Sequence, residues 1–446
     1  MFGFKYLGNT HVPHRKNTAQ MPAVKMPPPD EVLLHVAQNI GAPAKVVVKA
    51  GDEVKVGQVI AEAGGFVSAP IHASVSGKVV KVEKYLCYGG QTVDAVRIQS
   101  DGLMTVDESI APPVITDLDS LVEAVRNSGL VGLGGAGFPT SVKLAGAKNG
   151  SINTLVINGA ECEPYITADT RTMLDDTAYV VAGIELLEKC IPSIESIVFG
   201  IEANKPECIA RLQEAFKNDK KVTVKKLPSL YPQGSEKVLV YNCTGRTVME
   251  GKLPSDAGVI VMNVSSLAFI AKYAETGMPL VERTLTLDGS AVSEPKNITA
   301  PIGTAIGKVI EFGGGLKEEA GKVLYGGPMM GVCICNLEDP VLKTTNAITA
   351  FNKKDSTPAK ETACIHCGRC VSVCPHSLNP TEFARALNVE MKEVRMEKLD
   401  AAKVMLCMEC GSCSFVCPAN RPLVQNNRIA KAELRAYLAH QATLTK

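Results

Sequence analysis

Short runs of β-branched residues separated by glycine turns dominate the chain from Glu31 to about Ser100. Such runs favour strands, and the Gly-Asp or Gly-Gly pairs between them mark turns. The pattern therefore predicts an all-β module over residues 30–110. Its strand-like runs are residues 46–48, 54–56, 79–82 and 93–98.

A proline-rich segment precedes this module. Residues 1–29 hold Pro13, Pro22 and three consecutive prolines at 27–29, and they show little hydrophobic periodicity. Proline fixes the backbone and removes a hydrogen-bond donor, so the segment is a poor helix or central strand. We expect an extended arm that wraps the body of the protein, with a disordered terminus as the alternative.

Helical and strand-like patterns alternate between residues 115 and 275. In the segment from Asp117 to Asn127, the apolar residues fall on one helical face. This alternation predicts a Rossmann-like α/β domain with a mostly parallel sheet. The strand-like runs are residues 154–157, 196–199, 221–224 and 258–261, and the helical segments between them include residues 177–189 and 205–216.

The last part of the chain changes character twice. Residues 283–335 return to a β pattern with several glycine turns, which predicts a small β-grasp-like domain over 280–350. A polar linker, residues 352–361, leads into a region that is helical in character. We therefore expect a mostly α-helical domain with a helical tail over 355–446, and a multidomain α/β protein as a whole.

Composition excludes several classes of function. The 446 residues are 46% hydrophobic and 21% charged, which is typical of a globular chain of about three domains. Lys and Arg number 47 against 46 Asp and Glu, so we expect no nucleic-acid partner. No apolar run approaches the ~20 residues that span a bilayer. The start lacks an apolar signal stretch, and we expect the chain to stay in the cytosol.

Eight of the fifteen cysteines form an internal repeat near the end of the chain. The spacing C-x2-C-x2-C-x3-C-P begins at Cys364 and again at Cys407, a displacement of 43 (407−364). In two-cluster ferredoxins with this spacing, the fourth cysteine ligates the other [4Fe–4S] cluster. Paired zinc sites are the alternative. The predicted ligand sets are Cys364, Cys367, Cys370 and Cys417 for one cluster, and Cys407, Cys410, Cys413 and Cys374 for the other.

The other seven cysteines are isolated or nearly so in the sequence. Free cysteine is among the most often buried residue types, so we expect these side chains to pack in the core. They are Cys87, Cys162, Cys190, Cys208, Cys243, Cys333 and Cys335.

A glycine-rich segment, residues 132–140, contains the pattern G-x-G-x-x-G. It follows a predicted helix rather than a strand, so it lacks the context of the dinucleotide-binding fingerprint. A backbone with few Cβ atoms can nevertheless approach a phosphate or a flat ring closely, and the segment leads into a helix near Thr140. We predict a ligand-binding loop, with a plain flexible loop as the alternative.

Four motifs resemble the flavin- and NADH-binding subunit of respiratory complex I, and they occur in the same order. They are Gly134-Gly-Ala-Gly-Phe-Pro-Thr140, Asn158-Gly-Ala-Glu-Cys-Glu-Pro164, Tyr231-Pro-Gln-Gly234-Ser-Glu236 and Met262-Asn263. The segment from Val48 to Val79 also resembles the barrel-sandwich module that carries biotin or lipoate. The lysine that this module modifies is absent from the tip here, residues 64–68, which implies the fold without the carrier function.

Together with the motif at residues 325–331 and the cysteine repeat, these segments make the chain similar to the C subunits of Rnf complexes. Those complexes are membrane-bound ferredoxin:NAD+ oxidoreductases coupled to Na+ or H+ transport. The resemblance covers essentially the whole chain. It implies FMN, two [4Fe–4S] clusters, NADH or NAD+ as substrate, and membrane and ferredoxin-like subunits as partners. It also implies a peripheral place on the cytoplasmic side of the cell membrane, with membrane association through the partners.

The resemblance further implies roles for individual residues. Asn158 and Glu161 would meet the polar edge or ribityl chain of FMN, and Asn263 its phosphate end. Glu163 and Glu236 match acids that bind NADH, and acids beside a dinucleotide favour NADH over NADPH. The implied cofactor-binding residues are Gly132, Gly134, Gly135, Gly137, Phe138, Lys143, Asn158, Glu161, Tyr231, Gly234 and Asn263. The chain departs from the pattern at Ala160, Ser235 and Met262, where the pattern has Asp, Glu and Asn.

Two other functions fit parts of the sequence. A soluble flavin reductase of the same superfamily, such as the cobalamin reductases of bacterial microcompartments, shares the glycine-rich loop and both clusters. A zinc-stabilised scaffold with a vestigial flavin fold would share only the architecture. Membrane fractionation separates the first from an Rnf-type protein, and the brown colour of iron–sulfur protein separates the second.

Overall fold

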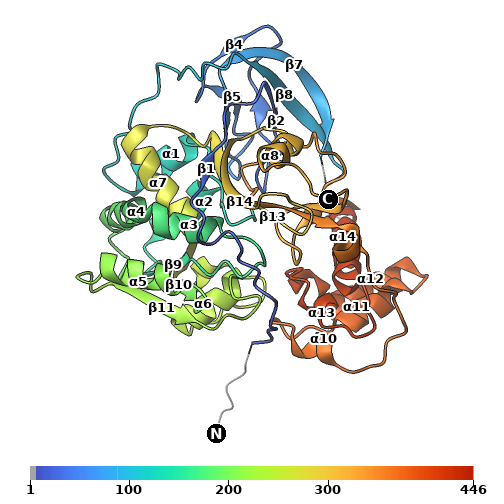
Figure 1. Cartoon of the computed structure of the whole chain (residues 1–446). Coiled ribbons are helices and arrows are strands. Elements are labelled where there is room, and N and C mark those ends of the chain that lie inside the picture. Colours follow the sequence, from blue (N-terminus) through green and yellow to red (C-terminus); the bar gives the residue numbers. More distant parts are fainter. Residues whose placement is uncertain (1–6, 88, 445–446) are drawn as a thin grey trace.

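The computed structural model describes residues 7–87 and 89–444, whose strands form four sheets (Figure 1). The N-terminal module contains two of them, with the orders β2-β8-β7-β4 and β3-β5-β6, and every pairing is antiparallel. Its strands are β2 (Glu31–His35), β3 (Lys45–Val46), β4 (Glu53–Val54), β5 (Val59–Glu62), β6 (Ile71–His72), β7 (Gly77–Leu86) and β8 (Thr92–Ser100). The all-β pattern of the sequence is confirmed.

A four-stranded sheet with the order β11-β10-β9-β12 lies in the second part of the chain, and all its pairings are parallel. This confirms the sheet predicted from the alternating pattern. Its strands are β9 (Thr154–Asn158), β10 (Ser196–Glu202), β11 (Val222–Leu227) and β12 (Val259–Asn263). The helices of this part are α1 (Leu118–Asn127), α2 (Thr140–Ala145), α3 (Ala168–Asp175), α4 (Thr177–Cys190), α5 (Pro206–Ala215), α6 (Glu236–Thr244) and α7 (Val264–Thr276), with short 3-10 turns η1 (Gly146–Asn149) and η2 (Pro254–Ala257).

The third part forms a six-stranded mixed sheet with the order β1-β14-β13-β17-β15-β16. Helix α8 (Ile306–Phe312) packs its buried residues into the core of this sheet. The strands are β1 (Val24–Lys25), β13 (Glu282–Asp288), β14 (Lys296–Pro301), β15 (Ala320–Tyr325), β16 (Val332–Cys333) and β17 (Ala347–Asn352). Because β1 belongs to the N-terminal arm, this sheet is completed by a segment that is distant in the sequence.

The C-terminal part is helical, as its sequence predicts. The stretch expected to be a linker, residues 352–361, begins with a short helix because the Asn352 side chain accepts a hydrogen bond from the Asp355 amide at 2.9 Å. The helices are α9 (Lys353–Ser356), α10 (Arg369–Ser372), α11 (Pro380–Leu387), α12 (Lys392–Ala401), the 3-10 turn η3 (Val404–Leu406), α13 (Ser412–Phe415) and α14 (Leu423–Leu444). None of the helices in residues 7–87 and 89–444 is both long and apolar enough to cross a membrane.

Residues 7–29 run as an extended arm along the parallel-sheet part and towards the cysteine-bearing helices (Figure 1). Thr10 and Tyr231 exchange two backbone hydrogen bonds, at 2.8 and 2.9 Å. A side chain at Gly8 would collide with the backbone of Cys374. The first six residues of the predicted arm lie outside the described residues. The arm therefore contacts both regions in which the sequence predicts cofactor sites.

Candidate flavin and iron–sulfur site

Asn158 and Asn263 end the neighbouring parallel strands β9 and β12, and they are register partners. In open parallel sheets, ligands bind beyond the carboxyl ends of the strands. The Asn263 side chain accepts hydrogen bonds from the Ser265 and Ser266 amides at 3.0 and 3.2 Å and so begins α7. Its amide nitrogen donates to Asp169 at 2.7 Å. The two asparagines thus mark one end of the sheet as a candidate ligand site.

The glycine-rich loop lies beside Asn263, between α1 and α2. Its central residues, Gly134 to Ala136, are exposed. A Cβ atom added at Gly134 would lie 3.3 Å from the side-chain nitrogen of Asn263. Gly137 has a φ of +70°, and a Cβ there would lie 2.7 Å from a methyl group of Thr344. Glycine at 134 therefore keeps open a surface beside Asn263, and glycine at 137 is required by the backbone itself.

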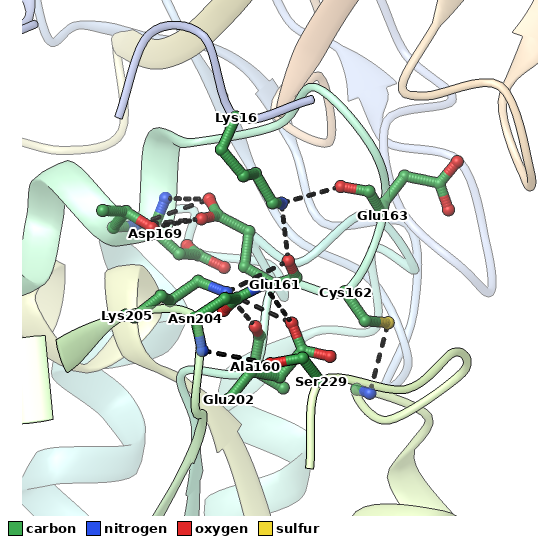
Figure 2. Close-up of polar contacts among 12 residues, drawn as sticks. Lys16, Ala160, Glu161, Cys162, Glu163, Asp169, Glu202, Asn204, Lys205 and Ser229 are labelled. Atoms are coloured by element: carbon green, nitrogen blue, oxygen red, sulfur yellow. Dashed lines mark hydrogen bonds and ion pairs between the residues drawn. The ribbon is translucent and has the colours of Figure 1, made fainter. Parts of the chain in front are cut away.

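Glu161 follows β9 in a turn of unusual backbone conformation, with a φ of +47°. Its carboxylate accepts a hydrogen bond from the Asp169 amide at 2.7 Å, where α3 begins (Figure 2). It also accepts one from the Thr170 hydroxyl at 2.5 Å. Burial raises the pKa of this carboxyl, and the nearby Lys16 ammonium opposes the rise. The resemblance places Glu161 at a flavin edge, whereas its carboxylate here accepts hydrogen bonds from the first turn of α3.

Glu163 connects three segments of the site. One carboxylate oxygen accepts hydrogen bonds from the Met329 and Met330 amides at 2.6 and 3.2 Å, and the Tyr231 hydroxyl donates to the other at 3.4 Å. Burial raises its pKa, and these hydrogen bonds oppose the rise. A side chain at Gly327 would collide with Glu163. The glycine turn at residues 326–331 therefore closes directly over this acid.

The loop that contains Tyr231 and Gly234 packs against the end of β9. The Asn158 side chain donates to the Gly234 carbonyl at 2.9 Å, and the Gly234 amide donates to the Cys162 sulfur at 3.3 Å. Tyr231 is 2% exposed, and its hydroxyl donates to the Cys410 carbonyl at 2.7 Å. The loop thus connects the strand-end site to the cysteine repeat.

Lys143 and Glu236, two predicted nucleotide-binding residues, form an ion pair of 2.7 Å. Lys143 lies on α2 and also donates to the Val261 carbonyl at 3.1 Å, while Glu236 begins α6. Phe138, predicted from the sequence to be a stacking ring, lies in the glycine-rich segment two residues before α2 and is partly buried. The pair therefore connects α2 to the start of α6.

The cysteine repeat folds into two groups of thiols that each draw on both halves of the repeat. A cavity is lined by Cys374 together with Cys407, Cys410 and Cys413. In the other group, burial raises the pKa of the Cys370 thiol, and the neighbouring Cys417 and Cys367 raise it further. Cys374 therefore lies with three cysteines of the second repeat, and Cys417 lies near two cysteines of the first. The crossed ligation itself stays a prediction.

Hydrogen-bond donors surround the sulfurs of the first group. The Leu378 amide donates to the Cys374 sulfur at 3.3 Å, and the Glu409 amide to the Cys407 sulfur at 3.4 Å. The Asn427 side chain donates to the Cys407 sulfur at 3.4 Å. Such donors tune the potential of an iron–sulfur cluster, so this group fits the predicted cofactor. In the described part of the chain, no three His, Cys, Asp or Glu side chains meet at a point that could hold one metal ion.

The expectation for the isolated cysteines holds for four of them and is wrong for two. Cys333 and Cys335 are exposed, because they lie on and just after β16, the short edge strand of the six-stranded sheet. Cys162 is partly buried beside Gly234. The buried ones are Cys87, Cys190, Cys208 and Cys243.

The three departures from the complex I pattern have distinct environments. Ala160 and Met262 are buried, at 0% and 2% exposure. Ser235 precedes α6, and its hydroxyl lies 3.2 Å from the sulfur of Met408, next to the cysteine cavity.

Sequence reasoning missed several residues that hold the site. Asp169 accepts hydrogen bonds from Asn263 at 2.7 Å and from the Ser265 hydroxyl at 2.6 Å, and burial raises its pKa. Arg283, on β13, donates to the Leu133 carbonyl in the glycine-rich loop at 2.5 Å, and burial lowers its pKa to about 10. No local sequence signal marks these contacts, because each connects segments that are far apart in the chain.

The fold and the site define a multidomain α/β protein in which a strand-end ligand site adjoins a two-cluster ferredoxin-type module. Family models agree with this description: the Nuo51 FMN-binding domain matches residues 125–272 and the 4Fe-4S dicluster domain matches residues 361–421. The RnfC barrel sandwich hybrid domain matches residues 4–103, and the SLBB domain matches residues 284–332. The chain belongs to the family of C subunits of Rnf-type ion-translocating oxidoreductase complexes.

Similar proteins cover nearly the whole chain. The C subunit of the Na(+)-translocating ferredoxin:NAD(+) oxidoreductase complex of Acetobacterium woodii is 45% identical over 96% of this chain and 97% of its own. The C subunit of the proton-translocating ferredoxin:NAD(+) oxidoreductase complex of Clostridium ljungdahlii is 44% identical over 95% of this chain and 92% of its own. Among solved structures, an NAD+-reducing [NiFe]-hydrogenase in the H2-reduced state has a TM-score of 0.51 at 18% identity, covering 74% of this chain and 67% of that one. That similarity concerns the fold alone.

Proposed function

We propose that this chain is the NADH-facing electron-transfer subunit of a membrane-bound ferredoxin:NAD+ oxidoreductase. Electrons pass between nicotinamide, FMN and two [4Fe–4S] clusters, and partner subunits couple this transfer to Na+ or H+ transport. The family assignment, the FMN-binding domain match and the dicluster match support this function. The partners are the other subunits of the complex, and the chain is a peripheral subunit on the cytoplasmic side of the membrane.

The observation that carries the proposal is the contact between Tyr231 and Cys410. The Tyr231 hydroxyl donates to the Cys410 carbonyl at 2.7 Å, and both residues pack in one cluster with Val12. Tyr231 belongs to the loop at the sheet end, and Cys410 lines the cysteine cavity. A flavin site and an iron–sulfur site in direct packing contact are what electron transfer between the two cofactors requires.

Residues at the end of the parallel sheet would hold FMN. Gly134 and Gly135 are exposed beside Asn263, so a ligand can approach the backbone there. Asn158 at the end of β9 and Gly234 in the neighbouring loop, joined by a hydrogen bond, would border it on the other side. Bound FMN supplies the conversion between two-electron hydride transfer and the one-electron steps of iron–sulfur clusters. Glu163 and Glu236 would bind the NADH ribose hydroxyls and disfavour the extra phosphate of NADPH.

The two cysteine groups differ in their surroundings. The group of Cys374, Cys407, Cys410 and Cys413 lies against the Tyr231 loop. In the group of Cys364, Cys367, Cys370 and Cys417, Cys367 is exposed. Ile365 and Phe415, which lie close to these cysteines in the sequence, are also exposed, at 67% and 47%. The first group therefore serves the cluster nearer the flavin, and the second serves the outer cluster that exchanges electrons with a ferredoxin-like partner.

The finer architecture is part of the same proposal. We assign a Rossmann-like domain to residues 115–275 and a β-grasp-like domain to residues 280–350. The barrel-sandwich domain spans residues 30–110, and the ferredoxin domain with its tail spans residues 355–446.

Anaerobic purification of the membrane complex followed by NADH-dependent activity tests the function. The expected result is co-purification of this chain with membrane subunits and NADH oxidation that depends on it. A soluble flavin reductase of the cobalamin reductase type would stay out of the membrane fraction. A zinc scaffold would contain zinc and no flavin. Either result would overturn the proposal.

A further inference from the structure

Lys16, on the N-terminal arm, places its ammonium group inside the turn that follows β9. It donates hydrogen bonds to the carbonyls of Glu161, Glu163 and Ile166 at 2.7, 2.8 and 2.6 Å. Figure 2 shows the lysine side chain reaching the backbone of Glu161 and Glu163. A lysine ammonium has three donors, and here three carbonyls accept them. These carbonyls belong to the turn that carries Glu161 and Glu163.

The turn is strained and needs such support. Glu161 and Tyr165 have φ values of +47° and +71°, a region that side chains with a Cβ rarely adopt. Residues in such conformations persist when the surrounding structure holds them in place. The arm supplies a second contact here, since the Tyr165 amide donates to the His14 carbonyl at 3.0 Å. The arm therefore holds both ends of the turn.

A second lysine, which is buried, holds the other side of the turn but comes from the parallel-sheet part itself. Lys205 donates to the Ala160 carbonyl at 2.6 Å and lies 3.3 Å from the carboxylate of Glu202 (Figure 2). The Glu202 side chain is fully buried. Lys205 therefore has a buried counter-charge next to it, whereas the three hydrogen-bond acceptors of Lys16 are backbone carbonyls of one turn.

We propose that Lys16 is a positioning residue of the nicotinamide site, which fixes the turn from Glu161 to Ile166 and through it the carboxylate of Glu163. This inference rests on the proposed function, because it takes Glu163 as an NADH-binding acid. The arm is thereby part of the active site. It also joins that site to the cysteine groups, since Val12 packs against Tyr231 and Cys410.

Lys16→Met in the full complex tests the role, because methionine keeps the length of the side chain and removes the three donors. The expected result is a rise in the KM for NADH on the order of tenfold, with kcat, FMN content and iron content retained. Reduction of the flavin by dithionite should be unchanged, because dithionite does not use the nicotinamide site. Lys25→Met is the matched control: Lys25 lies on the same arm and its side chain is 70% exposed, paired with Glu282.

An unchanged KM in Lys16→Met with full flavin would overturn the proposal. If that variant instead loses cofactors or melts at a lower temperature, Lys16→Ala with added ethylammonium decides. Recovery of the NADH KM by ethylammonium supports a positioning role, and a failure to recover it shows a purely structural one. A wild-type complex with bound flavin that does not oxidise NADH would overturn the proposed function itself, whatever Lys16 does.

Discussion

Asn158 and Asn263 are register partners at the last positions of two adjacent parallel strands, β9 and β12. The Asn158 side chain turns to the Gly234 loop, with 2.9 Å between its nitrogen and the Gly234 carbonyl oxygen. The Asn263 side chain turns to α7 and Asp169. One pair of strand ends thus organises both sides of the candidate flavin site, and the glycine-rich loop lies beside Asn263.

Gly134→Val should empty the flavin site while leaving the iron content unchanged. A Cβ at this position would lie 3.3 Å from the Asn263 side chain, and a branched side chain would fill the exposed surface beside it. FMN released on mild denaturation, measured by fluorescence against the iron content, gives the occupancy.

The matched control for Gly134→Val is Gly146→Ala, because a Cβ at Gly146 meets nothing within 4 Å and its φ is −60°. Gly137→Val is a weaker test, since its φ of +70° and the Thr344 methyl group strain any side chain there. Full flavin occupancy in Gly134→Val would remove the loop from the site.

Crossed ligation of the clusters makes a second prediction. Cys374→Ser should perturb the cluster held by Cys407, Cys410 and Cys413, because these thiols line one cavity with Cys374. Cys417→Ser should perturb the other cluster, where Cys417 lies near Cys370 and Cys367. Paramagnetic resonance spectra of each reduced variant, together with iron contents near eight atoms per wild-type chain (about four per cluster), measure this. Loss of the cluster nearest in the sequence in each variant would contradict it.

The parallel sheet could be predicted from the sequence because its strands leave local signals, and the predicted cluster ligands, which stay a prediction, rest on an equally local spacing. The apolar run at residues 154–157 and the three similar runs become the four parallel strands, and the repeated C-x2-C-x2-C-x3-C spacing constrains its thiols directly. The motif around Glu161 predicts a flavin contact, but the carboxylate of this residue accepts a hydrogen bond from the Asp169 amide in the first turn of α3. A motif identifies which residues gather at a site, while the direction of each side chain depends on tertiary neighbours such as Thr170.

The arm illustrates what the sequence could not provide. Lys16 is one of 47 basic residues and lies in a segment without periodicity, so nothing local marks it as buried. Its partners lie in the turn from Glu161 to Ile166, far along the chain. The exposure of Cys333 escapes sequence reasoning for a related reason, since the position of β16 at the sheet edge follows from pairing order rather than from residue type.

Glu163→Gln and Glu236→Gln should each raise the KM for NADH, with FMN and iron contents unchanged. A charge-assisted hydrogen bond is worth roughly 1.5–3 kcal/mol, so the loss in kcat/KM should be on the order of ten- to a hundredfold. The amide still accepts one hydrogen bond, which favours the lower end. The kcat/KM for NADPH should rise relative to that for NADH, because removing negative charge lessens repulsion of the 2′-phosphate of NADPH. Stopped-flow reduction by NADH, NADPH and dithionite gives the comparison, and equal losses with dithionite would contradict the assignment.

The buried ammonium of Lys16 predicts how activity depends on pH. Burial lowers its pKa from the ordinary 10.5 to about 8, although Glu161 opposes the shift. Above pH of about 8 the neutral amine has two donors for three carbonyls, so one carbonyl of the turn loses its partner. The kcat/KM for NADH should therefore fall above that pH. The charged or titratable groups that act on or respond to Lys16 are Glu161, Glu163, Glu202, Lys205, Cys162 and His14.

The contribution of Lys16 to the stability of the fold should change in the opposite direction to kcat/KM as the pH rises above about 8. The folded-state pKa of Lys16 lies below the unfolded value, so between about pH 8 and 10.5 the unfolded chain binds more protons. The contribution of this group to stability therefore rises with pH while NADH affinity falls, which separates loss of positioning from unfolding. Steady-state kinetics and melting temperatures across this range measure both quantities. Lys25→Met should keep the alkaline fall in kcat/KM and Lys16→Met should lack it; a fall that persists in Lys16→Met would assign it to another group.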